Sequence, residues 1–308
     1  MEQKSDKFHK NLASLIVTFN PSNSDYNSIS SCLGQVGDII VLDNSTNSLS
    51  RNNLIEFVKT IQSSTKVHIV LNEKNLGLSK SYNEGIRIAR SLGSQFLILM
   101  DQDSYFLKDS IVELYYAYEE MKSLGFVGVI SPTIVLKKGN IESIFSRIGD
   151  KISFAMHKKF ENNSIIQSNF TINSGTFLPI SIINEDRFYD EELFTDGIDI
   201  LFCYKLKSRE LGIFRSKRSY LIHNENASFF KIGGLTLPIF LYNSKRLYHI
   251  IHDYLTLFKK TYISHPFSGL RHLLDLVISL MINFFFGQDR RQIMQTVCRA
   301  TDEWINNR

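Results

Sequence analysis

Two carboxylates separated by one residue, Asp101 and Asp103, come directly after the apolar run at residues 96–100 (FLILM). Like charges a few ångströms apart repel each other, and a divalent cation bound between them removes that cost. Carboxylate oxygens suit Mg²⁺ or Mn²⁺, with phosphate oxygens completing the coordination shell. The pattern therefore predicts a divalent-cation site. The alternative is a solvated turn in which Asp103 or Ser104 caps a helix.

A second polar group lies in the segment 72–85 (NEKNLGLSKSYNEG), which runs from the end of an apolar strand into an expected helix. Asn75 and Gly77 tolerate a left-handed backbone, and N–H groups at a helix N-terminus bind anions. Lys74 or Lys80 could then reach a phosphate. The segment predicts a phosphate-binding loop, with an ordinary left-handed turn before a capped helix as the alternative.

The elements that must position these residues alternate along the first 104 positions. Strands are expected at 12–19, 38–42, 66–71 and 96–100, and helices at about 27–35, 50–62 and 79–92. Such alternation predicts βαβ units and an α/β fold with a mostly parallel, buried sheet. Ligands of such sheets bind at the carboxyl ends of the strands. Asn20, Asp43 and Asp101 stand at three of these ends.

The pattern changes in the rest of the chain. Further strands are expected within 126–136, 165–172 and 174–179, and at 152–157 and 219–223. An acidic loop followed by a helix is expected within 189–212, and the chain after about 237 has helical spacing. We therefore predict a domain over residues 1–236, with halves 1–104 and 105–236, and a helical extension over 237–308.

The composition is that of an ordinary globular protein, because 43% of the 308 residues are hydrophobic and 21% are charged. This excludes a disordered or low-complexity chain. Residues 205–308 hold 16 Lys and Arg against 7 Asp and Glu, an excess that suits phosphates or an anionic membrane surface. No pattern points to a nucleic-acid partner. Three dispersed cysteines and a polar N-terminus without an apolar segment predict a cytoplasmic location.

Four motifs together resemble a known family: VTFNPS (17–22), DIIVLDNS (38–45), VLNEKNLGLSKSYNEGIRIAR (70–90) and LILMDQDS (97–104). They are similar to the family-two inverting glycosyltransferases of GT-A fold. The motif DQDS is most similar to that of the rhamnosyltransferase-like subgroup, which builds bacterial O-antigens and related surface polysaccharides. The likeness covers about residues 12–225. It implies a nucleotide-binding half, 1–104, and an acceptor half, 105–236.

The resemblance implies the substrates and the roles of single residues. The donor would be dTDP-rhamnose, or else a UDP-hexose or UDP-galactofuranose, and the acceptor a lipid-linked glycan. For the nucleotide, Thr18 and Asn20 would line the pocket, Asp43 would hydrogen-bond the base, and Asn75, Gly77 and Lys80 would lie along ribose and phosphates. Asp101 and Asp103 would hold ribose and the metal-bound diphosphate, and His223 would be a metal ligand that comes late in the chain. Ser174 and Gly175 would lie near the donor sugar and the acceptor. A plain buried histidine at a strand end is the alternative for His223.

The resemblance also implies a general base in the segment 196–199. Inverting transfer is a single displacement, in which a carboxylate takes the proton of the attacking hydroxyl. Asp199 matches the family position and is the first choice, and Asp196 is the second. They share a face if the loop opens a helix; ordinary first-turn carboxylates are the alternative. Leu201 and Lys205 replace the usual Glu and Arg of the subgroup, which leaves donor and acceptor identity open.

Two other classes of protein fit part of the pattern. Haloacid-dehalogenase-like phosphatases also place D-x-D after an apolar strand, but at the first strand and followed by Thr or Val two residues on. Here Tyr105 holds that position and three strands come first, which disfavours a phosphatase. A glycan-binding protein without catalytic activity would leave the paired carboxylates unexplained.

The C-terminal segment 270–287 carries a broad apolar stripe at helical spacing. The stripe holds Leu270, Leu273, Leu274, Val277, Ile278, Met281, Phe284 and Phe285, flanked by Lys259, Lys260, Arg271, Arg290 and Arg291. One interpretation is a helix on the inner surface of the cytoplasmic membrane, suited to a lipid-linked acceptor. The other is a helix packed on the core or in a homodimer interface. No 18-residue apolar run is present, because Asp275 interrupts residues 273–286, so no ordinary transmembrane helix is expected.

Overall fold

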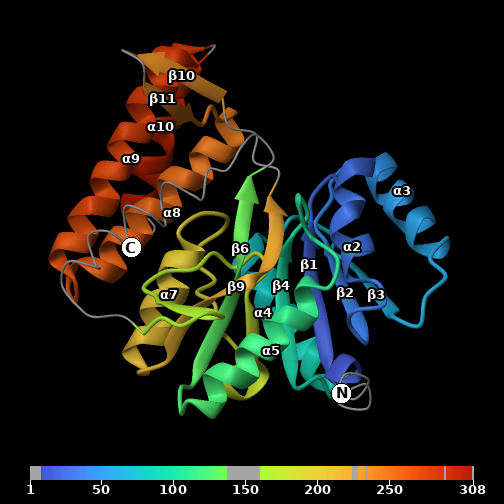
Figure 1. Cartoon of the computed structure of the whole chain (residues 1–308). Helices are drawn as coiled ribbons and strands as arrows, with labels where there is room; N and C mark the ends of the chain where they lie inside the picture. The colour runs from blue at the N-terminus through green and yellow to red at the C-terminus, as the bar shows by residue number, and fades with distance from the viewer. Residues whose placement is uncertain (1–7, 137–159, 224–227, 233–234, 288, 307–308) are drawn as a thin grey trace. The chain divides into compact units, whose positions relative to one another are not determined.

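The computed structural model describes residues 8–136, 160–223, 228–232, 235–287 and 289–306 (Figure 1). The chain forms two compact units. Unit 1 comprises Met1–Tyr189 and Phe202–Asn224, and unit 2 comprises Asp190–Leu201 and Glu225–Arg308. Helix α7 (Ile198–Ser208) begins in unit 2 and ends in unit 1. The domain boundaries expected after residues 104 and 236 remain predictions.

The four strands expected first in the sequence are confirmed. They are β1 (Leu12–Thr18), β2 (Asp38–Asp43), β3 (Lys66–Leu71) and β4 (Phe96–Asp101), paired in parallel in the order β3-β2-β1-β4. Thr18 lies opposite Asp43, and Val17 lies opposite Asp101. The carboxyl ends of three neighbouring strands therefore meet at one edge of the sheet, as the sequence predicts.

Helices pack on both faces of this parallel half. They are α2 (Asn27–Cys32), α3 (Ser48–Lys59), α4 (Leu78–Ser91) and α5 (Ser110–Ser123), with a short 3-10 helix, η1 (Asn23–Tyr26), before α2. Ser14 of β1 contacts Cys32 of α2 (Oγ to Sγ, 3.4 Å). Leu15, on the other face, packs so close to Gly85 of α4 that a Cβ there would come within 2.3 Å. This two-sided cover explains why all of β1 is buried.

The rest of the sheet is mixed in direction (Figure 1). It comprises β5 (Ser104–Phe106), β6 (Gly128–Leu136), β7 (Ile165–Ser168), β8 (Phe177–Pro179) and β9 (Gly212–His223), with a 3-10 helix, η2 (Ile180–Ile182), after β8. The order continues β4-β8-β6-β9-β5, and β7 pairs with β9. β9 is longer than the expected strand at 219–223, and its last residue, His223, pairs with Ser104 of β5. The strand expected at 152–157 lies outside the described residues.

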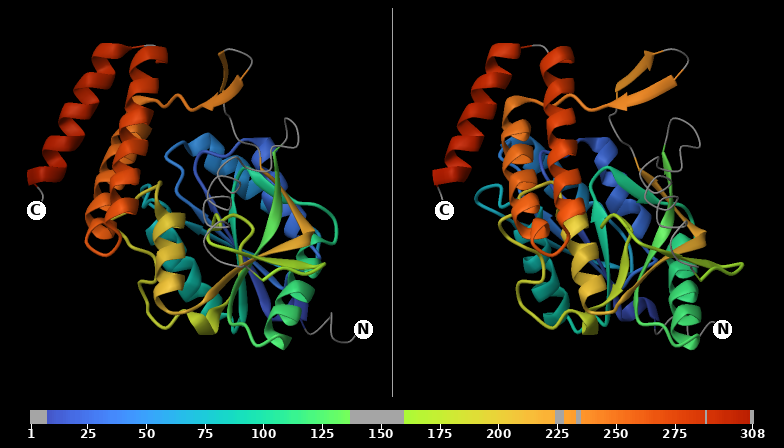
Figure 2. Two further views of the ribbon diagram at one scale, coloured as in Figure 1. Left: turned by 60° about the vertical axis from the view of Figure 1, so that its left-hand side comes forward. Right: turned by 90° about the vertical axis from the view of Figure 1, so that its left-hand side faces the viewer.

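Unit 2 is built mainly from three helices, as expected for the chain after 237 (Figure 2). They are α8 (Ser244–Tyr262), α9 (Pro266–Phe286) and α10 (Arg290–Asn306). A hairpin of β10 (Ser228–Ile232) and β11 (Leu235–Ile239) precedes them, and it is not among the strands expected from the sequence. The helices enclose a small core of Leu247, Ile250, Ile251, Leu276, Ile293 and Ala300.

Helix α9 is longer than the apolar run at 273–286, because Pro266 begins it. Among the described residues it is the one helix that is long and apolar enough to cross a membrane by length and composition, with a mean hydropathy of 1.5 over 18 residues. Only 22% of that stretch is buried. The core helix of a soluble protein meets the same criteria of length and composition.

Candidate functional site

The two carboxylates of the D-x-D pattern lie with His223 at the carboxyl edge of the sheet in unit 1. Asp101 ends β4, Asp103 follows it, and the pairing of β5 with β9 brings His223 alongside. One ligand atom of each of the three residues lies within 4.8 Å of the others. Two oxygens and one imidazole nitrogen form a donor set that fits Mg²⁺ or, better, Mn²⁺, which accepts nitrogen more readily. The residues present therefore fit the cation that the sequence predicts.

The electrostatics of this cluster favour a bound cation. Burial raises the pKa of Asp103, and the neighbouring charge of Asp101 raises it further, whereas His223 opposes the shift. His223 Nδ1 lies 3.7 Å from Asp103 Oδ1 and 2.5 Å from the Ser104 hydroxyl oxygen. The ionised form of Asp103 is thus costly in the protein alone, and a cation would stabilise it.

The predicted donor-sugar residues Ser174 and Gly175 lie beside this cluster. The Asp101 backbone N–H donates to the Ser174 hydroxyl (3.2 Å), and the Gly175 N–H donates to the Leu99 carbonyl (2.7 Å). Gly175 has φ +78°, and a Cβ there would come within 2.7 Å of Pro132. Only glycine fits this turn without strain. The turn therefore holds Ser174 against the end of β4.

The Asp43 carboxylate is fully buried and already has three polar partners. Oδ1 accepts from the hydroxyls of Thr18 (2.8 Å) and Ser45 (2.6 Å), and Oδ2 lies 3.3 Å from Arg51 Nε. Arg51 also donates to the carbonyls of Ser45 (2.5 Å) and Asn72 (2.7 Å). These contacts use three of the roughly four acceptor positions of the carboxylate, and the fourth lies on Oδ2. In this geometry Asp43 organises the loops around the predicted pocket. Arg51, which no sequence motif marks, joins Asp43 to the loops that carry Ser45 and Asn72.

Asn20 connects the loops after β1 and β2. Its φ is +47°, and its side-chain oxygen accepts from the backbone N–H groups of Thr46 (3.0 Å) and Asn47 (2.9 Å). Gln102, between the two carboxylates, accepts from the Phe19 N–H (2.7 Å). The residue inside the D-x-D pattern therefore ties the β4 loop to the β1 loop.

The predicted phosphate-binding loop has the expected left-handed glycine. Gly77 has φ +79° and stands as the N-terminal cap of α4, and its N–H donates to the Asn75 side chain (2.9 Å). Lys80 is exposed in the first turn of α4. Asn44 joins this loop to β2, because it donates to Ser81 (3.0 Å) and accepts from Asn72 (2.8 Å).

The predicted base residues Asp196 and Asp199 belong to unit 2. Helix α7 begins at Ile198 after Gly197, whose φ is +72°, so Asp199 lies in its first turn and Asp196 precedes it. The two residues therefore do not share a helix face. Burial raises the pKa of Asp196, with Arg246 opposing, and its Oδ2 has no hydrogen-bond partner among the described residues. A buried carboxyl with a raised pKa marks a candidate functional residue.

Within each unit, one further residue contacts a predicted site residue without being singled out in the sequence. Tyr82 donates its hydroxyl to Asp101 (3.3 Å), and Asp253 of α8 accepts the backbone N–H of Asp196 (2.9 Å). Lys205, a departure from the family pattern, donates to the Phe188 carbonyl (2.6 Å) and pairs with Glu185 (2.6 Å). The available signal is Asp253 itself, a charged residue among mainly apolar neighbours in a segment of helical spacing.

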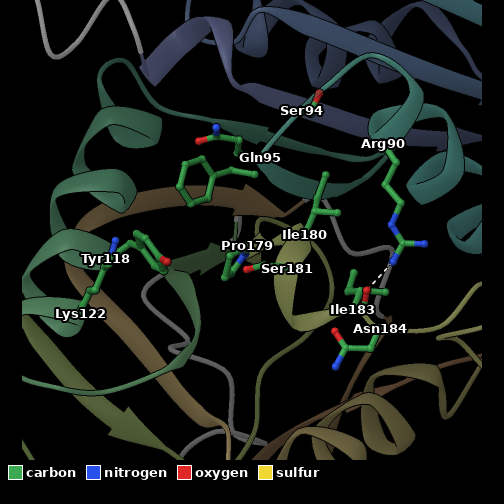
Figure 3. A pocket seen from close by; sticks show the side chains of 11 residues that line it. Arg90, Ser94, Gln95, Tyr118, Lys122, Pro179, Ile180, Ser181, Ile183 and Asn184 are labelled. Carbon is green, nitrogen blue, oxygen red and sulfur yellow. Dashed lines mark hydrogen bonds between the residues drawn. The ribbon is translucent and has the colours of Figure 1, made fainter.

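A separate hollow of about 650 Å³ lies at the opposite end of β4 (Figure 3). Its lining includes Arg90, Gln95, Phe96, Lys122 and Asn184. The Arg90 guanidinium donates to the Ile183 carbonyl, as the dashed line in Figure 3 marks. Phe96 is the first residue of β4 and Asp101 is the last, so this hollow is distinct from the candidate site.

Comparisons with known proteins agree with this geometry. Residues 15–182 match the family Glycosyl transferase family 2. The dTDP-rhamnosyl transferase RfbF of Shigella flexneri is 25% identical over 264 residues, which cover 83% of this chain and 82% of that protein. A crystal structure of GalNAc-T7 with UDP, GalNAc and Mn²⁺ aligns with a TM-score of 0.52 and 14% identity, over 73% of this chain.

The chain spans only 44% of the GalNAc-T7 structure, and that likeness shows the fold alone. The family match covers more than half of the chain and contains the whole carboxyl edge of the parallel strands, including Asp43, Asp101 and Asp103. The chain therefore belongs to glycosyl transferase family 2, and it is a glycosyltransferase with a GT-A-like α/β fold.

Proposed function

We propose that the enzyme transfers rhamnose from dTDP-rhamnose, with inversion, to a lipid-linked surface glycan such as an O-antigen precursor. The observation that carries the transfer chemistry is the cluster of Asp101, Asp103 and His223 beside Ser174. The proposed donor is supported by RfbF, which is named for dTDP-rhamnosyl transfer. The membership of family 2 leaves the phosphatase and glycan-binding alternatives without support.

In this proposal the carboxyl edge of the sheet holds the donor. Thr18, Asn20 and Asp43 shape the nucleotide pocket, and Asn75, Gly77 and Lys80 face ribose and phosphates. Asp101, Asp103 and His223 would hold Mg²⁺ or Mn²⁺. Such a cation supplies positive charge for the diphosphate leaving group. Ser174 and Gly175 adjoin the sugar.

The acceptor hydroxyl loses its proton to a carboxylate of the segment 196–199. Asp199 is the proposed base because it matches the family position. Asp196 is the alternative because its buried oxygen has no partner among the described residues and its pKa is raised. A raised pKa brings a base closer to neutral pH, where proton transfer is most efficient.

A comparison of donors tests the proposed sugar nucleotide. At a concentration about 100 times its dissociation constant, a ligand that binds only the folded protein stabilises it by about 2.7 kcal/mol. We therefore expect dTDP-rhamnose with Mn²⁺ or Mg²⁺ to raise the melting temperature by several degrees, and UDP-galactose or UDP-galactofuranose to raise it less. The same scan with EDTA is the control. A larger shift with a UDP-sugar would reject the rhamnose donor in favour of the hexose alternatives.

We also propose that α9 attaches the enzyme to the inner face of the cytoplasmic membrane, where a lipid-linked acceptor would lie. Eight large apolar side chains of α9 are exposed: Phe267, Leu270, Leu274, Val277, Ile278, Met281, Phe285 and Phe286. Arg271, Arg290 and Arg291 near them are also exposed. Lys260 is instead engaged with Asp190 (2.6 Å). An apolar stripe beside exposed cations matches an anionic bilayer surface.

Sedimentation with phosphatidylglycerol vesicles tests this attachment. The variant Leu274→Ser/Phe285→Ser should pellet at least about tenfold less, because each apolar side chain withdrawn from water contributes about 1.5–3 kcal/mol. Salt should weaken wild-type binding without abolishing it, since it screens only the charges. Leu49→Ser in α3 is the control, because its side chain is 66% exposed against 57% for Leu274 and 58% for Phe285. Equal pelleting of both variants, or a vesicle-independent homodimer lost in the α9 variant, would contradict the membrane proposal.

A further inference from the structure

A single buried carboxylate of α8 binds three consecutive backbone N–H groups in unit 2. Asp253 Oδ1 accepts from Phe194 N (2.8 Å), and Oδ2 accepts from Thr195 N (2.8 Å) and Asp196 N (2.9 Å). The Asp253 side chain is fully buried. Hydrogen bonds to an ionised acceptor are stronger than neutral ones. Burying a charge is costly without such partners. The loop therefore stabilises the buried carboxylate, and the carboxylate in turn fixes the backbone of the loop.

The same face of α8 contacts the loop at three further points. The His249 ring stacks on Phe194, with centroids 3.9 Å apart and an angle of 11° between the planes. Leu257 lies against Gly197, close enough for a Cβ there to come within 3.2 Å. Lys260 pairs with Asp190 (2.6 Å) and with Glu192 (3.3 Å). One stripe of α8 makes all these contacts, because its residues 249, 253, 257 and 260 follow helical spacing. This stripe packs along the loop 190–197.

We propose that Asp253 is a positioning residue for sugar transfer, which sets the backbone of 194–196 and thereby the carboxylates of Asp196 and Asp199. The inference rests on the proposed function, because it needs one of these carboxylates to act as the base. Asp196 donates its own N–H to Asp253, and Asp199 begins α7 directly after Gly197. A displacement of about 1 Å at a reacting group costs about 10²-fold in rate. Helix α8 is then part of the catalytic machinery.

The substitution Asp253→Asn tests whether Asp253 positions the loop 194–196 without unfolding the protein. The one acceptor oxygen of the asparagine can keep the bonds from Thr195 and Asp196, but its NH₂ group then faces the Phe194 N–H. One N–H is left without an acceptor and the loop loosens. In the full-length enzyme with Mn²⁺, we expect Asp253→Asn to lower kcat about 10–10²-fold. The dissociation constant of dTDP, measured by calorimetry, should stay within about twofold.

Hydrogen exchange supplies a direct readout of the loop. The amides of 194–196 should exchange faster in Asp253→Asn, whereas those of the α8–α9 core should not. Asp275→Asn in α9 is the matched control, because Asp275 is half-buried and lies 3.9 Å from Arg271. This variant should keep kcat and loop exchange unchanged. If Asp253→Asn fails to accumulate, Asp253→Glu keeps the charge, displaces it by one methylene group and should lower kcat in the same way.

Four results separate the possible failures. Wild-type kcat in a position-253 variant whose loop amides exchange faster would overturn the positioning role. An equal loss of dTDP binding and kcat in the position-253 variant would also overturn it, and so would an equal loss of kcat in Asp275→Asn. Either result points to general structural damage. Absence of sugar transfer by the wild type with every nucleotide-sugar tested would instead reject the proposed function itself.

Discussion

Asparagine in place of Asp103 is expected to reduce metal-dependent sugar transfer by about 10²–10³-fold, the usual effect of losing one group that stabilises developing charge. Folding should survive, because the raised pKa of Asp103 shows that its ionised form is unfavourable in the protein without a cation. The neutral amide removes that cost. The melting temperature without metal should therefore stay level or rise, while calorimetry should show weaker Mn²⁺ binding.

The matched control for this variant is Asp186→Asn. Asp186 is exposed and lies 3.5 Å from Arg90, at the end of unit 1 that holds the hollow of Figure 3. It should change neither Mn²⁺ binding nor transfer. Undiminished activity of Asp103→Asn in excess EDTA would show that the cluster of Asp101, Asp103 and His223 holds no catalytic cation.

The second large loss of sugar transfer is expected when the proposed general base, Asp199, is replaced. Asp199→Asn should leave dTDP binding nearly intact and lower transfer roughly 10²–10⁴-fold, because general-base catalysis contributes that much. Asp196→Asn makes the same chemical change three residues earlier and is the internal control, with a smaller loss expected. Steady-state kinetics with saturating donor distinguish the two variants.

The opposite ranking would transfer the role to Asp196. Its burial and raised pKa make it chemically suited, and its amide variant should then show the full loss. Wild-type rates in both variants would mean that the proton leaves by another group and that the assignment of segment 196–199 fails.

The parallel half of the fold is predictable from sequence because each strand is buried on both faces and reads as a continuous apolar run. Periodicity finds such runs directly. The strand ends then place Asn20, Asp43 and Asp101 by simple topology, and the register of β1 with β2 and β4 confirms their shared edge. The two members of the D-x-D pattern follow from the same logic.

The contacts that complete the site come from pairings far apart in the chain, which local pattern does not encode. His223 reaches Asp103 because β9 pairs with β5, and Asp253 reaches Asp196 from 57 residues away. The buried carboxylate of Asp43 depends in the same way on Arg51 of α3. The sequence shows that these side chains are charged. Only the fold shows which partners satisfy them.

The path of the chain through its two units has a consequence for biosynthesis. Residues 190–201 pack with residues 225–308, although the chain returns to the sheet between them. A growing polypeptide exposes the segment with Asp196 and Asp199 before the stripe of α8 that holds it has been made. At synthesis rates of about 5–20 residues per second, this segment waits several seconds for its support. We expect a nascent chain stopped before α8 to form the strands of the sheet and yet lack transferase activity, so that the enzyme becomes active only after α8 has emerged from the ribosome.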